Sequence, residues 1–311
     1  MKRSDIELGF AATKVEGKKR VIVITGANAG LGRETARRLL LAGMRVVCAC
    51  RSEKKGKLAA TELLAETVDR PDPSIDDALF MQLDVSSLQS VRSFIEHYKR
   101  SGLPLHALLC NAGIMMGPRR TSVDGIELQL ATNYLGHFEL CRGLTDQLIA
   151  SAPSRVVHVS SVAAHRGRIP LDNLNASADN YDSRSVYSMT KLLQVIFSRA
   201  LNRRLEPAGV TSNSIEPGVV ATNLSAGITD NAAMRRRLEQ GISVEEGAST
   251  QILLCGAQQL HGRGGGHWAE GQEITHRFAK FGAPSLSPLD LEQAIWKASE
   301  ALVQAYTENT H

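Results

Sequence analysis

The chain has 311 residues, with 36 lysines and arginines against 32 aspartates and glutamates, so its formal net charge at pH 7 is only +4. The hydrophobic fraction of 43% and the charged fraction of 22% are ordinary for a globular protein of one large or two small domains. The basic residues are spread along the chain rather than gathered into a stripe, which argues against a dedicated nucleic-acid-binding protein.

The N-terminal segment and the cysteines indicate the compartment. Residues 1–19 are polar and predict neither a signal peptide nor a transmembrane helix, and no later stretch reaches the roughly 18 apolar residues that a membrane span needs. The five cysteines lack paired Cys-x-x-Cys spacing, and the nine histidines form no metal-binding motif. We therefore expect a soluble, cytoplasmic protein with reduced thiols and no metal, while peripheral membrane contact stays open.

Short β-branched apolar runs alternate with longer amphipathic stretches along most of the chain. In chain order they predict strands at 21–25, 45–50, 79–83, 105–110, 155–160 and 210–215, and helices at 34–41, 54–67, 86–99, 126–149 and about 187–205. This alternation predicts an α/β fold of a single domain, a doubly wound parallel sheet of about seven strands with helices on both faces. Residues 1–19 would be a polar extension of the domain at 20–311, and the less regular residues 223–285 would form a lid over the substrate.

A glycine-rich turn follows the first predicted strand directly. Gly26 permits a tight turn, Gly30 lets the backbone approach a pyrophosphate, and Gly32 allows close packing of the helix on the strand. An ordinary strand-to-helix turn is the alternative, but three glycines at this junction favour a dinucleotide site. The contacts predicted for this turn are Gly26, Asn28, Gly30, Leu31 and Gly32.

The second predicted strand ends in a basic residue, Arg51. A site for NAD usually places an acid here to bind the ribose 2′-hydroxyl. Arg51, together with Arg33 just past the glycine turn, suits a 2′-phosphate instead, so we predict NADP as the cofactor. Glu53 keeps NAD as the less favoured alternative, because its carboxylate could turn back toward a ribose hydroxyl.

Tyr187 and Lys191 form an acid/base pair by their spacing. Four residues apart on a helix, the two side chains share one face. A phenol has a pKa of about 10, and a nearby ammonium is expected to lower it toward neutrality. Alone, this pattern is usually a solvated helix face, but the glycine turn upstream gives it weight.

Several further motifs follow in a fixed order: Leu83-Asp84-Val85, Asn111-Ala112-Gly113, Asn133, Ser160-Ser161 and Pro217-Gly218. With the glycine turn and the Tyr187–Lys191 pair, they resemble the short-chain dehydrogenase/reductase family over roughly residues 20–222, which implies a Rossmann-type fold. The segments 121–127 and 133–138, and the long span from residue 161 to 187, resemble the branch of retinol dehydrogenases, WW-domain oxidoreductases and protochlorophyllide reductase.

The resemblance also implies roles for single residues. Tyr187 would exchange a proton with the substrate oxygen, Lys191 would hold the nicotinamide ribose, and Ser161 would hydrogen-bond the substrate. Ser160 is the rival of Ser161, although the family pattern favours the second serine. Asn133 would hold a water that connects Lys191 to solvent. The other implied cofactor contacts are Asp84, Val85, Asn111, Ala112, Gly113, Pro217, Val220 and Thr222.

The predicted activity is hydride transfer between NADP and a carbonyl or alcohol substrate, apolar in character, such as a retinoid-, steroid- or other lipid-like molecule. An apolar stripe and two methionines would line its site, although core packing explains them equally well; they are Leu224, Ile228, Met234, Leu238, Met115 and Met116.

One alternative is an idle nucleotide-binding scaffold, which the complete catalytic set argues against. A nucleic-acid partner, bound through the basic N-terminus and Arg235–Arg237, lacks both a motif and a concentration of charge. His158 is expected to be a packed or sheet-face histidine rather than a catalytic one. The family resemblance also implies a possible homodimer through the helices at 126–149 and 187–205.

Overall fold

The computed structural model describes residues 14–15, 17–115, 117–179, 181–220, 240–275 and 286–308, and these contain an eight-stranded sheet in the order β10-β9-β8-β7-β6-β3-β4-β5. Its strands are β3 Val21–Thr25, β4 Arg45–Cys50, β5 Ala78–Gln82, β6 Ala107–Cys110, β7 Ser154–Val159, β8 Val210–Glu216, β9 His267–Ala269 and β10 Gln272–Glu273. All neighbours pair in parallel except β10, which is antiparallel to β9. The predicted parallel α/β sheet is confirmed, with β10 as an additional edge strand.

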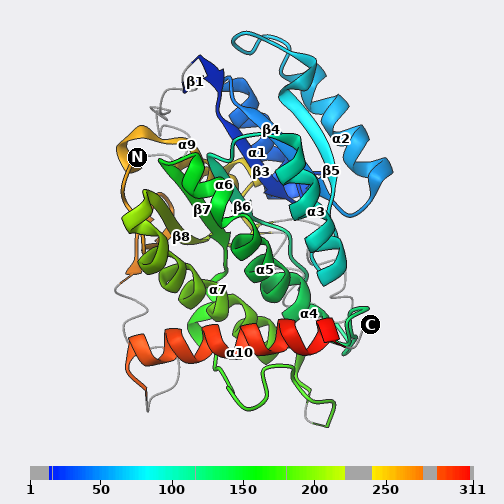
Figure 1. The fold of residues 1–311 in the computed structure, drawn as a ribbon, viewed down its shortest axis with the longest axis vertical. Coiled ribbons are helices and arrows are strands. Elements are labelled where there is room, and N and C mark those ends of the chain that lie inside the picture. Colours follow the sequence, from blue (N-terminus) through cyan, green and yellow to red (C-terminus); the bar gives the residue numbers. More distant parts are fainter. Residues whose placement is uncertain are drawn as a thin grey trace.

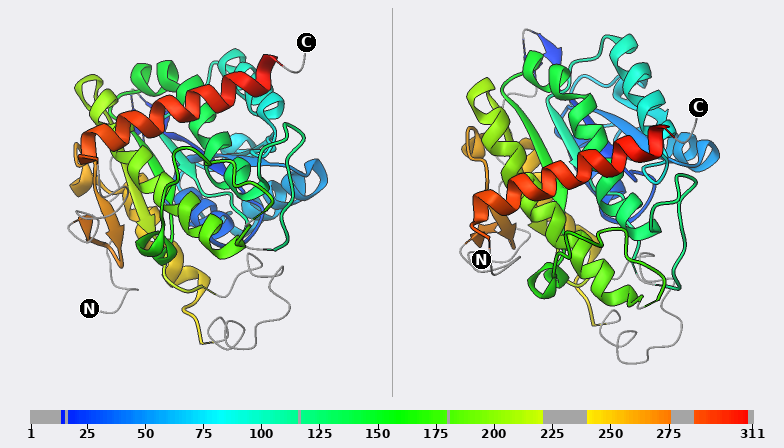
Figure 2. Two further views of the ribbon diagram at one scale, coloured as in Figure 1. Left: turned by 90° about the horizontal axis from the view of Figure 1, so that it is seen from below. Right: turned by 60° about the horizontal axis from the view of Figure 1, so that its bottom comes forward.

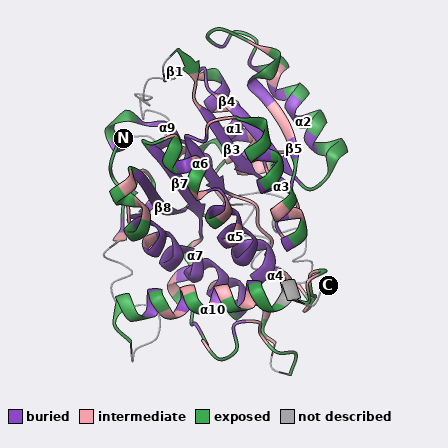
Figure 3. Ribbon diagram, in the orientation of Figure 1, coloured by how far each residue is buried: buried purple, intermediate pink, exposed green. Residues whose placement is uncertain are grey.

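Helices cover both faces of this sheet (Figure 1). One face carries α1 Gly30–Leu41, α2 Glu53–Glu66 and α9 Val244–Gly256, and the other carries α3 Leu88–Ser101, α5 Gly136–Gly143, α6 Thr145–Ala150 and α7 Ser183–Leu205. Along β3, Val21 and Val23 join one apolar cluster while Ile22 and Ile24 join the other. The strand is therefore buried on both faces, which is why it is a continuous apolar run in the sequence (Figure 3).

The single helix predicted over residues 126–149 is wrong. The segment is divided into α4 Leu128–Leu130, a π-helical turn at Ala131–Leu135, α5 and α6. Gly136 packs so closely on β5's following loop that an added Cβ would collide with the carbonyl oxygen of Val85. The π turn places Asn133 at a break in the regular helical ladder, and such turns are frequent at functional sites.

Part of the predicted lid belongs to the domain core instead. Within the range 223–285, α9 packs on α1 and β7, and β9 extends the sheet beside β8. A capping box begins α9, in which Ser243 and Glu246 each bind the other's backbone N–H. This pattern was readable in the sequence. Residues 221–239 and 276–285 lie outside the described residues, and with them Thr222 and the apolar stripe at Leu224, Ile228, Met234 and Leu238.

A further helix, α10 Pro288–Glu308, lies across α7 (Figures 1 and 2). The Trp296 ring packs 5.2 Å from Phe138 of α5 and 5.6 Å from Phe197 of α7, measured between ring centroids. The Tyr134 and Ser299 hydroxyls are hydrogen-bonded at 2.8 Å. α10 therefore covers part of the helices through which a homodimer was predicted, and the homodimer stays a prediction.

Smaller elements complete the described part of the chain. An antiparallel hairpin pairs β1 Lys14–Val15 with β2 Lys18–Lys19, and short 3-10 turns lie at Ile75–Asp77, Val162–Arg166, Glu206–Ala208 and Gln258–Leu260. The five cysteines are free and buried. Among the described residues, no helix combines the length and the apolar character needed to cross a membrane.

Candidate active site

A cavity of about 920 Å³ opens at the carboxyl ends of the parallel strands, where α/β sheets of this kind bind ligands. It is lined by residues that follow β3, β4, β5, β6, β7 and β8 and by α7. Of the predicted site residues, it brings together Gly26, Asn28, Gly30, Leu31, Arg51, Asp84, Val85, Asn111, Ala112, Gly113, Ser161, Tyr187, Lys191, Pro217 and Val220. Gly32, Arg33 and Asn133 do not line it.

The glycine turn has the backbone that its sequence predicts. Gly26 and Gly30 have φ angles of +69° and +54°, in the left-handed region that favours glycine. Gly32 packs tightly, since an added Cβ would lie 2.5 Å from Nδ2 of Asn111 and 2.6 Å from the carbonyl oxygen of Gly26. The N-cap residue of α1, Ala29, offers no side-chain cap to the first turn. The N–H groups of this turn therefore suit an anionic ligand.

Thr25, at the end of β3, joins this turn to the loop after β6. Its hydroxyl oxygen accepts hydrogen bonds from the backbone N–H groups of Asn111 and Ala112, both at 2.9 Å. The side-chain amide of Asn111 donates to the Thr25 carbonyl oxygen at 2.8 Å. The Thr25 hydroxyl also lies 2.9 Å from Nε2 of His137. Sequence reasoning missed this threonine, although its position before Gly26 was visible.

Two exposed cations, Arg51 and Lys55, line one end of the cavity. Lys55 was missed because a basic residue in the first turn of α2 looks like an ordinary solvated position. Neither cation has an ion-pair partner among the residues that the structure describes. At the same end, Asp84 is oriented by Ser86, whose N–H and hydroxyl donate to Oδ1 at 2.9 and 2.6 Å.

Arg33 does not take the place predicted for it. Its guanidinium pairs with Glu66 at 2.6 Å and with Glu62 at 3.1 Å, both on α2, and it does not line the cavity. Glu53, the acid that favoured NAD, pairs with Lys57 at 2.6 Å and is likewise absent from the lining. The basic character of this end therefore comes from Arg51 and Lys55.

Tyr187 and Lys191 lie at the other end of the cavity, buried on α7. Asp182 caps the N-terminus of α7, because its side chain accepts hydrogen bonds from two backbone N–H groups. The Lys191 ammonium donates to the Val159 carbonyl oxygen at 2.9 Å and lies 5.7 Å from the centre of the Tyr187 ring. Burial lowers the pKa of Lys191 to about 7. This side chain is therefore able to change its protonation state near neutral pH.

The predicted direction of the Tyr187 pKa is wrong for the protein alone. Burial raises the pKa of Tyr187 to about 12, and the hydrogen bond with Ser161 opposes this rise only in part. The sequence spacing showed a neighbouring cation but not the cost of burying a phenolate. Burial also disfavours the charged form of Lys191, so the positive charge that was expected to lower the Tyr187 pKa is itself less stable.

The two neighbouring serines have different partners. The Ser160 hydroxyl is buried and donates to the carbonyl oxygen of Lys191 at 2.7 Å. The Ser161 hydroxyl oxygen accepts from the N–H of Ala163 at 3.2 Å and is hydrogen-bonded with Tyr187. Ser161 thus lies beside the phenol, while Ser160 supports the helix that carries it.

Asn133 uses its side chain to connect elements around the cavity. Its Oδ1 accepts from the N–H of Ile114 at 2.8 Å, and its Nδ2 donates to the Ile114 carbonyl oxygen at 3.0 Å and to the Thr190 hydroxyl at 3.1 Å. Its own carbonyl oxygen accepts from Nε2 of Gln194 at 2.8 Å. The amide therefore ties the loop after β6 to α7, close to Lys191.

Comparison with known proteins agrees with this arrangement. The short chain dehydrogenase family pattern matches residues 20–233. The chain is 39% identical to human retinol dehydrogenase 12 over 263 residues, covering 84% of this chain and 81% of that protein. It is 35% identical to the WW domain-containing oxidoreductase of Danio rerio over 297 residues, covering 92% and 68%.

Solved structures show the same fold. An uncharacterised protein from Mycobacterium paratuberculosis has a TM-score of 0.68 at 30% identity, covering 92% of this chain and 93% of that chain. Pseudomonas aeruginosa RhlG, solved as a complex with NADP, has a TM-score of 0.63 at 24% identity, covering 80% and 93%. The chain therefore belongs to the short-chain dehydrogenase family, in its retinol dehydrogenase branch, and is an NAD(P)-dependent oxidoreductase acting on alcohol or carbonyl groups.

Proposed function

We propose that the protein is an NADP-dependent oxidoreductase of apolar carbonyl or alcohol substrates. The observation that carries the proposal is the division of one cavity between exposed cations at one end and buried Tyr187, Ser161 and Lys191 at the other. A bound nicotinamide supplies the hydride donor or acceptor, and the protein supplies orientation and proton handling.

Tyr187 is the proposed proton carrier. In reduction its hydroxyl gives a proton to the developing alkoxide, and in oxidation its phenolate takes the proton of the alcohol. Ser161 lies beside the phenol and hydrogen-bonds the same substrate oxygen, which orients it. Lys191 binds the nicotinamide ribose hydroxyls, and in its charged form it favours the phenolate of Tyr187.

Asn133 is proposed to act through other residues. Its amide holds the loop at Ile114 and the hydroxyl of Thr190, next to Lys191. A water held near this position would connect Lys191 to solvent, as the family resemblance implies. Asn133 is accordingly a positioning residue, and it does not contact the substrate.

The preference for NADP is proposed from Arg51 and Lys55. Both are exposed at the cavity, so each can meet a 2′-phosphate without first losing an ion pair with a described residue. Glu53, the acid that favoured NAD, pairs with Lys57 and does not line the cavity. The remaining cofactor contacts are proposed as predicted, with Lys55 added and Arg33 removed.

An apolar substrate is proposed from the lining beyond the nicotinamide position and from the relatives. Ile114, Met115, Val162 and Val219 line the cavity near Ser161 and Tyr187. Retinol dehydrogenase 12 and its paralogues are named for a long apolar alcohol. We therefore propose a retinoid- or lipid-like alcohol, aldehyde or ketone.

A substrate panel with both cofactors tests this function. The panel pairs all-trans-retinal, a ketosteroid and a medium-chain aldehyde with NADPH or NADH, and the corresponding alcohols with NADP or NAD, while nicotinamide absorbance is followed. We expect turnover of at least one apolar substrate, with higher kcat/KM for the phosphorylated cofactor. Binding of NADPH without turnover of any substrate would favour the idle scaffold, and an NADH preference would contradict the role of Arg51 and Lys55.

A further inference from the structure

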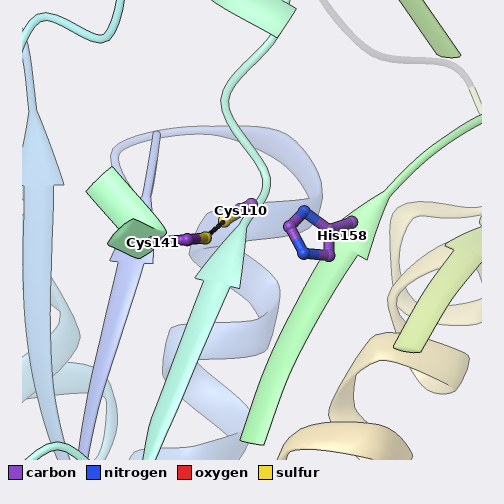
Figure 4. A group of neighbouring side chains, drawn as sticks. All are labelled: Cys110, Cys141 and His158. Atoms are coloured by element: carbon purple, nitrogen blue, oxygen red, sulfur yellow. Dashed lines mark hydrogen bonds between the residues drawn. The ribbon is translucent and has the colours of Figure 1, made fainter. Parts of the chain in front are cut away.

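Three potential metal ligands meet in the core behind the cavity: Cys110 at the end of β6, Cys141 on α5 and His158 on β7 (Figure 4). Cys110 and His158 are register partners on neighbouring parallel strands, so their side chains emerge on the same face of the sheet. The two sulfurs are 3.8 Å apart, and the ligand atoms of the three residues all lie within 4.8 Å of one another. None of the three lines the cavity.

The polar ring of His158 lies in an environment that offers it few polar contacts. Its side chain is completely buried, and neither ring nitrogen has a hydrogen-bond partner among the described residues. A neutral imidazole carries a lone pair on the ring nitrogen that bears no proton, and in His158 no described residue binds that nitrogen. Buried polar atoms normally have a partner because leaving them without one is costly. An imidazole nitrogen and two cysteine sulfurs together form a set of donors that suits a thiophilic metal.

The separation of the sulfurs fits tetrahedral zinc. With Zn–S bonds of about 2.3 Å, two sulfurs 3.8 Å apart subtend an angle of about 110° at the ion, close to the tetrahedral value. Two thiolates also neutralise a divalent cation, so the site would carry no net charge into an apolar core. Thiolate and imidazole donors select zinc over calcium or magnesium, which prefer oxygen ligands.

We propose that Cys110, Cys141 and His158 bind a structural zinc ion. Binding replaces the two S–H bonds with Zn–S bonds and releases two protons, while neutral His158 donates a nitrogen lone pair. The protein supplies three ligands, which leaves one position of a tetrahedral ion for a group outside this set. Because the site is fully buried, the ion enters as the chain folds.

The position of the site indicates its role. Cys110 immediately precedes Asn111, His158 lies three residues before Ser161, and Cys141 follows the π turn that holds Asn133. A zinc ion would fix β6, β7 and α5 to one another directly behind the cavity. It would stabilise the frame of the candidate active site without touching substrate or cofactor.

The test is a metal analysis of the whole chain. Protein is expressed in zinc-supplemented medium, purified without chelators and analysed by mass spectrometry of its metals. We expect about one zinc per chain in the wild type, and about a tenfold lower content in Cys141→Ala and His158→Phe. Cys255→Ala is the matched control, because Cys255 is also a buried free thiol but lies on α9 at the opposite face. It should retain the full zinc content.

Cobalt substitution of the wild-type protein tests the same site without relying on variants that fail to fold. Wild-type protein from cobalt-supplemented cells should show thiolate-to-cobalt charge-transfer absorption and tetrahedral visible bands at about one cobalt per chain. Folded wild-type protein with neither zinc nor these bands would overturn the proposal. So would a disulfide between Cys110 and Cys141 in the purified protein, or zinc retained undiminished in Cys141→Ala, which would place the ion elsewhere.

Discussion

Lys55 and Lys191 line the same cavity, but Lys55 is exposed to solvent, whereas Lys191 is only 4% exposed. At the Lys55 end, Arg51 adds a second cation that is exposed to water. At the Lys191 end, burial lowers the pKa of the ammonium to about 7, while the side chain rests on a backbone carbonyl. The difference in burial therefore distinguishes the end proposed to bind the cofactor phosphate from the end proposed to transfer the proton.

The strongest test of the buried end is Tyr187→Phe. This change removes the proton carrier but keeps the ring that packs in the cavity wall, so we expect kcat to fall by about 10²–10⁴-fold. The Kd for NADPH should change by less than about twofold, since the packing is retained. Steady-state kinetics and a binding titration measure the two effects. A variant that keeps a rate near that of wild type would mean that the proton passes through another group.

A second test separates the neighbouring serines. Ser161→Ala should lower kcat by about 10²-fold, because it removes a hydrogen bond to the substrate oxygen. Ser160→Ala should leave kcat within about tenfold but lower the free energy of unfolding by about 0.5–1.5 kcal/mol, because the Lys191 carbonyl loses the hydroxyl donor and keeps only its bond within α7. Kinetics and denaturant unfolding of both variants distinguish the two. Reversed results would exchange the assignments.

Lys191→Met tests how burial of the Lys191 ammonium makes the stability of the protein depend on pH. Between the folded pKa of about 7 and the usual value of 10.5, only the unfolded chain keeps the Lys191 proton, so this group makes stability rise with pH. Below pH 7 both states are protonated, and the full cost of burying the ammonium is present. The variant should therefore be more stable than wild type near about pH 6, with an advantage that shrinks by at most about 1.4 kcal/mol per pH unit above 7.

Denaturant unfolding of both proteins at about pH 6 and about pH 9 measures this difference. An advantage that stays constant over the range would show that Lys191 does not change protonation there. The buried and exposed ends of the cavity would then differ in accessibility but not in proton affinity.

The exposed end is tested by Arg51→Gln and Lys55→Gln. Each should lower the preference for NADPH over NADH by about fivefold, because an exposed ionic contact contributes about 1 kcal/mol, and the effect should weaken at high salt. Arg33→Gln is the matched control, since its charge is already bound by Glu62 and Glu66. Binding titrations with both cofactors should show an unchanged preference in this control. A loss of preference in Arg33→Gln alone would restore the original assignment.

Much of the fold was predictable because its central strands are buried on both faces. The runs Val21–Thr25 and Arg45–Cys50 were predicted with both ends correct, since each contains a continuous series of β-branched or small apolar residues that ends before Gly26 or Arg51. The short strands β9 and β10 were missed, because two or three residues are too few to show a period. The break at Ala131–Leu135 was also hidden, as apolar spacing continues through it.

The candidate site was predictable where local backbone geometry demands a residue type, as in the glycine turn. It was not predictable where the outcome depends on a distant partner or on burial. The acids that bind Arg33 are contributed by another helix, α2, about 30 residues along the chain. The rise in the Tyr187 pKa depends on exclusion from water, which sequence spacing does not reveal.

The contact between α10 and the helices beneath it has a consequence for synthesis on the ribosome. Trp296 is made 99 residues after Phe197, its partner across the contact (296 − 197 = 99). At a synthesis rate of roughly 5–20 residues per second, these 99 residues take about 5–20 s to make, and α10 does not cover the aromatic rings of α5 and α7 until then. During that interval the nascent chain presents a hydrophobic face, which is the kind of surface that chaperones bind.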